Sequence, residues 1–494
     1  MNNTFFFSNI KAFLIIIGFC FIFYSMQAQS SNTEYFMSSS FSNTTTNPAK
    51  RPEKGYVGIP ALTNYDVDFK TNTLNLDHLI FPGVGENGKS ALFLHENVSY
   101  DDFMKNISTK NYLGANVDWT LLGFGLYVKD LFLSFDISER SNVTLNIPKD
   151  LFDFTKRGFA MGEDGTTYNM SNLKATTKAF TQIGFGGSYP LLNQSLVVGA
   201  KVKILLGNAY ANFQLDNMRI DINNDLWKVS TQASGNMLIP TVQPRYDDTG
   251  KLSELNTDGS FSPFNGWGLG LDLGATFKPD NLPTGTLDWL KPDWLKPVTF
   301  SVALTDIGFI SWNKSKMTSL ATNPSEIIVT GNRTIHVDGS NEDLYKDLQD
   351  ALNDAIALYP SDNGSISSGL GAKLNWGVEY ALMDNRMNLG FLNTNYFNPV
   401  KTISELTLGG SYRLTGAVEV GLSYSFVHSK FQTFGFALHL GPGFYIASDY
   451  AIPHVNSSFI PTSTKALNFQ FGCVIPIGKK PKPNTRIPDT QVEE

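Results

Sequence analysis

The chain has 494 residues and a formal net charge of −7, and 13% of its residues are aromatic. The acidic balance and the absence of a basic patch argue against nucleic acid as a partner. Once the N-terminal signal described below is removed, Cys473 is the single cysteine, which excludes a fold stapled by intrachain disulfides.

Residues 1–28 are typical of a secretion signal. Lys11 is the only charged residue among them, and an apolar run extends from Ala12 to Tyr24. The run is shorter than the roughly 20 apolar residues that a membrane-spanning helix needs. We expect cleavage between Ala28 and Gln29, which leaves residues 29–55 as a polar segment ahead of the first strand.

Alternation of apolar and polar residues with a period of two dominates the chain after residue 56. The clearest stretch extends from Ser404 to Ile452, where large apolar side chains lie on one face and polar residues or glycine on the other. Such alternation, interrupted by tight turns, predicts antiparallel strands joined as a meander. The strands between Leu113 and Ile147 exceed the roughly five or six residues of soluble sheets and reach the roughly 9 to 11 of membrane strands.

Short and long connections alternate along the chain. The sequence predicts tight turns near Asp130, Asn193, Asp384, Thr415 and Gly441, and long loops at 72–111, 149–173, 216–263, 315–365 and 452–465. Outer-membrane barrels combine an even strand number with short periplasmic turns and longer outer loops. The pattern therefore predicts an all-β fold, a closed antiparallel transmembrane β-barrel of about 14 strands over residues 56–478. Both termini, including a polar tail at 479–494, would lie in the periplasm. A large soluble β protein is the alternative.

The long loops contain a few predicted elements. Short helices are expected over 100–107 and 148–157, and a small hairpin within 216–263. An amphipathic helix is expected from Asn341 to Tyr359, because Ser340 and Asp343 form a capping-box pattern and leucines recur every four residues.

The polar faces of the strands predict which residues line the interior of the barrel. The lumen-facing candidates are Asp118, Asp136, Arg140, Lys201, Lys203, Asp272, Glu379, Glu405, Arg413, Glu419 and His439. These charges have two interpretations: a polar path or headgroup site, or ion pairs that hold the interior together, which we favour. Glycines on the same faces leave room for another segment to approach and favour a filled lumen; they are Gly268, Gly270, Gly274, Gly409, Gly421, Gly435 and Gly472.

Motifs for catalysis or metal binding do not emerge. The six histidines lack metal-ligand spacing, and no G-x-S-x-G sequence indicates an α/β-hydrolase. We expect no catalytic residue, metal or cofactor. A lipid hydrolase carried by the barrel, with His439 and a serine of the lumen or rim, is the third functional hypothesis.

The sequence also resembles a known class of proteins. Asn47-Pro48-Ala49, after a secretion signal and before a predicted barrel, resembles the FadL-like class of outer-membrane proteins. The stretches 47–60, 146–152, 304–312 and 441–452 are similar to a Bacteroidota outer-membrane family of unassigned function. The resemblance implies that Asn47, Pro48 and Ala49 belong to a hatch inside the barrel.

The resemblance implies a passive transporter of hydrophobic or amphipathic small molecules. The alternative is a non-transporting scaffold or shuttle component of a secretion or surface machine, as in type IX secretion. The expected partners are outer-membrane lipid, a hydrophobic small-molecule ligand and envelope proteins.

Overall fold

The computed structural model describes residues 31–73, 80–81, 83–85, 88–93, 95, 97–157, 165–223, 226–260, 262–283, 285, 289, 292–323, 325–330, 357–362, 364–397, 402–427, 431–441, 443–450 and 465–478. The predicted signal, residues 341–356 of the predicted helix and the predicted tail lie outside these residues.

Antiparallel strands close into a barrel of 14 strands, as the sequence predicts, with β1 and β2 together forming the first. The strands are β1 (Gly55–Gly58), β2 (Asn64–Thr71), β5 (Lys110–Val128), β6 (Leu131–Pro148), β8 (Lys174–Leu191), β9 (Leu196–Ile222), β13 (Gly266–Phe277), β14 (Val298–Trp312), β19 (Lys373–Leu382), β20 (Met387–Tyr396), β21 (Ile403–Thr415), β22 (Val418–Val427), β23 (Phe431–Leu440), β24 (Phe444–Ser448) and β25 (Ala466–Ile477).

Closure comes from the pairing of the first and last strands. β2 pairs with β25 on one side, with Tyr65 opposite Phe471, and with β5 on the other, with Val67 opposite Val117. A closed sheet leaves no edge of unpaired backbone groups, which hydrocarbon requires because it offers no hydrogen-bond partner.

The tight turns fall where the sequence predicts them and gather at one end of the barrel. Strands β5 and β6 are separated only by Lys129 and Asp130, and β19 and β20 by residues 383–386. Asn193 and Asp384 have positive φ angles of 56° and 54°, which asparagine and aspartate tolerate in such turns. We call this end the short-turn end, and the opposite end the long-loop end.

The apolar faces of the strands point outward. Leu408, Leu422 and Phe434 are 47%, 65% and 66% exposed, although large apolar side chains are ordinarily buried. Similar side chains on β8, β9, β13 and β14 continue this apolar surface around the barrel, including Phe185, Val202, Leu269 and Val302. A continuous apolar exterior around a polar interior is the arrangement of a transmembrane β-barrel.

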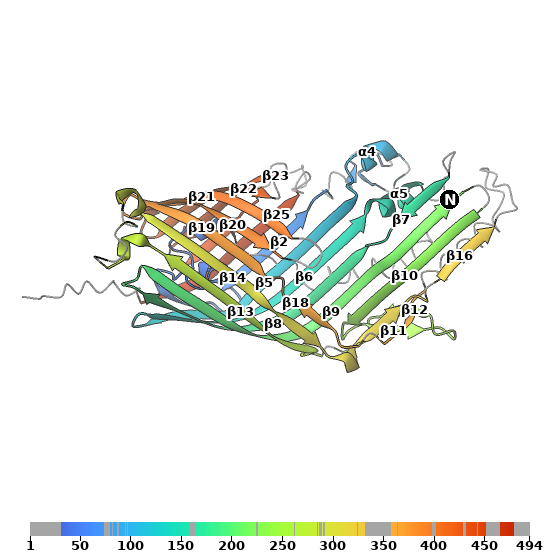
Figure 1. The fold of residues 1–494 in the computed structure, drawn as a ribbon, viewed down its shortest axis with the longest axis horizontal. Helices are drawn as coiled ribbons and strands as arrows, with labels where there is room; N and C mark the ends of the chain where they lie inside the picture. Colours follow the sequence, from blue (N-terminus) through green and yellow to red (C-terminus); the bar gives the residue numbers. More distant parts are fainter. Residues whose placement is uncertain are drawn as a thin grey trace, which may run out of the picture.

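The sheet extends past the barrel at the long-loop end, which the sequence does not predict. β9 continues to Ile222 and pairs with β10 (Leu226–Leu238), which pairs in turn with β15 (Thr318–Ala321) and β16 (Ser325–Thr330). In Figure 1 these strands reach the right-hand side. The sequence predicts a long loop over 216–263, and this prediction is wrong where the loop would cover the end of β9 and the whole of β10. The predicted small hairpin corresponds to β11 (Gln243–Tyr246) paired with β12 (Leu252–Asn256).

Short elements cover the long-loop end and line the interior. They are η1 (Glu34–Phe36), α2 (Asn43–Thr46), β3 (Ile80–Phe81), β4 (Ala91–Leu92), α4 (Tyr100–Met104), α5 (Lys149–Arg157), β7 (Thr166–Asn169), β17 (Tyr359–Pro360), β18 (Ser367–Gly369) and η6 (Lys314–Lys316). At the short-turn end, η3 (Pro279–Asn281) and η5 (Asp293–Leu295) lie in the connection between β13 and β14, where Asn281 donates to the Gln194 carbonyl of the β8–β9 turn. Because Tyr359 belongs to β17, the predicted helix does not reach it. None of the described helices is long and apolar enough to cross a membrane.

Candidate functional site in the barrel lumen

Residues 31–54, which we call the N-terminal segment, fill the short-turn half of the lumen. Glu34, Tyr35 and Phe36 of η1 are almost completely buried. The Asp449 carboxylate accepts hydrogen bonds from the backbone N–H of Asn32 at 2.7 Å and of Thr33 at 2.8 Å. The start of the segment is therefore held by a wall carboxylate.

Further along, Ser39, His439 and Glu34 form a hydrogen-bonded chain. The Ser39 hydroxyl lies 3.0 Å from Nδ1 of His439, and Nε2 of His439 lies 2.9 Å from Oε1 of Glu34. The order resembles a serine–histidine–carboxylate triad, the arrangement that the hydrolase hypothesis needs.

The backbone groups beside Ser39 point to a different role. A hydrolase needs free N–H donors for the developing oxyanion, but the N–H groups of Ser38 and Ser39 both donate to the Glu419 carboxylate, at 3.1 and 3.0 Å. A carboxylate at that place would repel an oxyanion. The chain of hydrogen bonds therefore anchors the N-terminal segment to β22 and β23.

The Asn47-Pro48-Ala49 sequence docks the other end of the segment on β13 and β14. The Asn47 amide donates to the carbonyl oxygens of Ala275 and Val302, each at 3.3 Å, and its Oδ1 accepts from the backbone N–H of Ala49 at 2.8 Å. A Cβ at Gly274 would collide with Asn47 and would lie 2.9 Å from the Pro48 ring. The close approach is possible because this wall position has no side chain.

Substitution of Gly274 by valine is expected to unseat the N-terminal segment while the barrel still assembles. Overpacking of this kind costs about 1–3 kcal/mol, which raises the unseated population about 5- to 150-fold. Protease added to purified barrel should then cleave within residues 31–54 faster than in the parent. Gly416→Val is the matched control, because nothing lies within 4 Å of the Cβ position there. Equal cleavage rates in the two variants would contradict the docking contact.

Two ion pairs tie the segment to wall residues near the short-turn end. Lys50 lies 2.7 Å from Glu379, and Arg413 lies 2.8 Å from Glu53. Burial lowers the pKa of the Lys50 ammonium, and the adjacent Glu379 carboxylate opposes that effect. Glu379 therefore offsets part of the cost of burying the Lys50 ammonium, and its removal would leave that ammonium without a carboxylate partner among the described residues.

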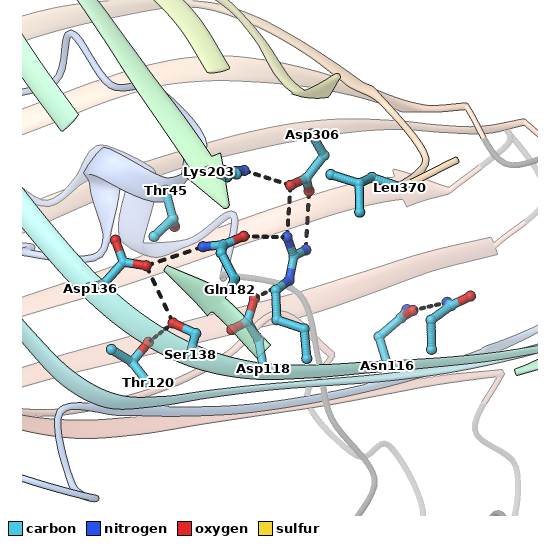
Figure 2. Close-up of polar contacts among 12 residues, drawn as sticks. Thr45, Asn116, Asp118, Thr120, Asp136, Ser138, Gln182, Lys203, Asp306 and Leu370 are labelled. Atoms are coloured by element: carbon cyan, nitrogen blue, oxygen red, sulfur yellow. Dashed lines mark hydrogen bonds and ion pairs between the residues drawn. The ribbon is translucent and has the colours of Figure 1, made fainter. Parts of the chain in front are cut away.

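In the middle of the lumen, Asp306 lies close to several cationic side chains. Its carboxylate lies 2.7 Å from Arg140 and 2.6 Å from Lys203, and Lys373 is 3.6 Å away. Figure 2 shows Lys203 directed at Asp306, with Gln182 and Asp118 close by. Asp306 has a φ of 57° within β14, beside a shift in register with β13, so the strand is locally distorted there.

The charged residues that the sequence assigns to the lumen all take part in ion pairs. Arg140 pairs with Asp118, Lys201 with Asp136, Lys203 with Asp272, and Arg413 with Glu419 as well as Glu53. Glu379 and Glu405 pair with Lys50 and Lys70, and His439 is hydrogen-bonded to Glu34. The cations proposed to attract a ligand carboxylate are thus matched by carboxylates of the protein.

Sequence reasoning missed Asp306, Asp68, Lys70, Lys178 and Lys373. Asp68 and Lys70 lie on a strand with the pattern Asp-Val-Asp-Phe-Lys, which alternates as the others do and could have been included. The Lys178 ammonium donates to the carbonyl oxygens of Gly369 and Leu370, and no carboxylate of the described residues pairs with it. The sequence does not indicate that Asp306 faces the lumen, because the local distortion of β14 is not visible in the alternation of apolar and polar residues.

Two adjoining cavities occupy the long-loop half of the lumen. The first, which we call the acidic cavity, is lined by Asp68, Lys70, Tyr112, Asn116, Thr394, Tyr396, Ile403 and Glu405. The second is lined by residues that include Arg140, Lys178, Phe180, Asp306, Leu370 and Lys373. Asn116 and Tyr396 line both cavities, so the two adjoin.

The fold and the lumen define an outer-membrane β-barrel with a partly filled interior. The model of a family of unknown function (DUF5723) matches residues 48–449 of this chain, and the chain belongs to that family. The chain matches none of the curated proteins with which it was compared.

Solved structures similar to this one include monoaromatic hydrocarbon channels. A TodX monoaromatic hydrocarbon channel mutant is 11% identical, with a TM-score of 0.38, and the match covers 91% of this chain and 98% of that one. The CymD monoaromatic hydrocarbon channel is 10% identical, with a TM-score of 0.36 and coverage of 89% and 92%. A FadL homologue from Pseudomonas aeruginosa is 11% identical, with a TM-score of 0.38 and coverage of 92% and 100%.

Proposed function

We propose that this barrel is a passive transporter of amphipathic or hydrophobic small molecules, and that the N-terminal segment is its hatch. The mature chain begins near Gln29 in this proposal. A substrate enters from the long-loop end, occupies the adjoining cavities and leaves when the N-terminal segment is displaced. The protein is a channel and not an enzyme.

The observation that carries the proposal is the division of the lumen into two halves. The short-turn half is filled by residues 31–54, which are held by hydrogen bonds and ion pairs and not by apolar packing alone. The long-loop half contains cavities with both aromatic and charged walls, such as Tyr112, Tyr396 and Phe180 beside Glu405 and Lys178. A cavity of this mixed character suits an amphipathic molecule.

Dye entry into cells tests the proposal. The hydrophobic dye N-phenyl-1-naphthylamine fluoresces after it crosses the outer leaflet, and cells that express the barrel should take it up faster than cells that do not. Asn116→Trp, which fills the wall shared by both cavities, should remove most of the increase. Leu422→Trp, on the exposed lipid face, is the matched control and should not change uptake. Equal uptake with and without the barrel would refute transport of this class of compound.

We propose further that the short-turn end faces the periplasm. A peptide tag inserted at Gly250, in the turn between β11 and β12 at the long-loop end, should be stained on intact cells. A tag at Asp384, in the turn between β19 and β20, should be stained only after the outer membrane is permeabilised. The reverse pattern would invert the proposed orientation.

A role as a scaffold in a secretion or surface machine is the second candidate. The observation in its favour is the sheet of β9, β10 and β16, which projects past the barrel and buries its own apolar cluster around Ile220 and Val229. A transporter has no evident need for this projection. Stable co-purification of another envelope protein that is lost when the projection is shortened would favour this candidate.

A further inference from the structure

Among the residues that line the acidic cavity, two carboxylates, Asp68 and Glu405, face one ammonium, Lys70. The Lys70 ammonium lies 3.4 Å from Oδ1 of Asp68 and 3.5 Å from Oε2 of Glu405, so a single ammonium forms ion pairs with two carboxylates. Both carboxylates are nearly inaccessible to solvent, at 1% and 2% exposure. Burial of a carboxylate is costly unless an opposite charge and hydrogen bonds compensate it.

The hydrogen bonds of this cavity are incomplete in the same place. Asn116 donates to Oδ2 of Asp68 at 3.1 Å, and the Tyr450 hydroxyl donates to Oε2 of Glu405 at 2.8 Å. Among the described residues, Oδ1 of Asp68 has only the Lys70 ammonium nearby at 3.4 Å, and neither Oε1 of Glu405 nor the buried Oγ1 of Thr394 receives a hydrogen bond. All three atoms belong to residues that line the one cavity.

We infer that the acidic cavity binds a small monovalent cation, either an inorganic ion or the ammonium group of a small molecule. Its ligands are Oδ1 of Asp68, Oε1 of Glu405 and Oγ1 of Thr394. A single positive charge balances the excess of one carboxylate over one ammonium. A divalent metal fits less well, because no group of three or more acidic, histidine or cysteine side chains among the described residues is arranged to hold one.

The walls favour a cation in a second way. Tyr112 and Tyr396 line the cavity, and the Lys70 ammonium already lies 5.2 Å from the centre of the Tyr450 ring. Aromatic faces attract cations that have lost part of their water. The cation site is independent of transport: it requires only the cavity and its oxygens, so its test can succeed or fail whatever the dye uptake shows.

Thermal unfolding of the purified full chain in detergent tests the site. N-methyl-D-glucamine hydrochloride, whose cation is too large for the cavity, is replaced stepwise by potassium chloride or methylammonium chloride at constant total salt. The unfolding midpoint of the parent should rise and saturate, because a ligand that binds only the folded state stabilises it. An affinity at least tenfold higher for potassium would indicate an inorganic ion, and one at least tenfold higher for methylammonium would indicate an amine. Equal affinities would support a site that accepts either cation.

Substitutions of the proposed ligands test whether the stabilisation by cations arises in the acidic cavity. Glu405→Gln should weaken the apparent affinity at least tenfold, and Thr394→Val should weaken it severalfold while keeping the shape of the side chain. If Glu405→Gln does not assemble, Thr394→Val carries the test. Glu379→Gln is the matched control, since Glu379 is a lumen carboxylate that pairs with Lys50 away from this cavity. An unfolding midpoint of the parent that does not change with either salt would contradict the proposed site. Saturation curves in Glu405→Gln and Thr394→Val that equal the curve of the parent would also contradict it.

Discussion

Deletion of residues 31–54 should yield a barrel that inserts correctly and leaks small solutes at least ten times faster than the parent. The physical reason is that these residues fill the short-turn half of the lumen, while the strands close on one another without them. Barrels of somewhat larger strand number than this one have water-filled channels once their interior is empty. Single-channel conductance in planar bilayers measures the effect directly.

The control for this deletion removes a different terminal piece. A chain without residues 479–494 should keep the permeability of the parent, because β25 ends at Ile477. Heat-dependent migration on gels should show that both truncated barrels are folded. Unchanged conductance in a folded barrel that lacks residues 31–54 would mean that other residues close the lumen.

Substitution of Asp306 by asparagine should lower the stability of the barrel by about 3–5 kcal/mol, the cost of breaking a buried ion pair. Asparagine keeps the size of the side chain and tolerates the positive φ of 57° at this position, so the change isolates the charge. Arg140 and Lys203, which contact the carboxylate at 2.7 and 2.6 Å, would be left with less negative charge nearby. Urea unfolding in detergent measures the loss.

A second substitution separates charge from shape at Asp306. Adding Lys373→Met to Asp306→Asn removes the cation that, among the described residues, pairs with Asp306 and with no other carboxylate. It should recover part of the lost stability, so the two effects should not add. Asp293→Asn is the matched control, because that carboxylate is almost fully exposed and its partner among the described residues is an exposed lysine at 2.6 Å. A loss of similar size in Asp293→Asn would show that the Asp306 effect is not due to a buried pair.

Much of the barrel could be predicted from the sequence because its signals are local. Alternation places Leu408 and Leu422 on the lipid face and Glu405 and Glu419 inside, and the structure has the same alternation. Turns at Asp130 and Asp384 also follow from short stretches of sequence. The projection of β9 and β10 does not, since its apolar residues, such as Met218, are interrupted by polar ones that indicate a loop.

The candidate site was predicted less well because it depends on contacts between distant residues. The alternation assigns Glu405 to the interior but cannot show that Lys70, more than 300 positions earlier, is its partner. Nor does it reveal which oxygens lack hydrogen bonds, as at Thr394. The inward glycines were more informative: Gly274 and Gly421 indicate room for a segment, and Pro48 and Met37 lie against them.

A disulfide between the N-terminal segment and the wall tests most directly whether transport requires displacement of this segment. Met37→Cys with Gly421→Cys suits this purpose, because a Cβ at Gly421 would lie 3.3 Å from Cγ of Met37, close to disulfide geometry. Cys473→Ser removes the competing thiol. The account predicts that the oxidised variant takes up N-phenyl-1-naphthylamine no faster than cells without the barrel, and that reduction restores uptake. Uptake at the parent rate in the fully cross-linked barrel would contradict it.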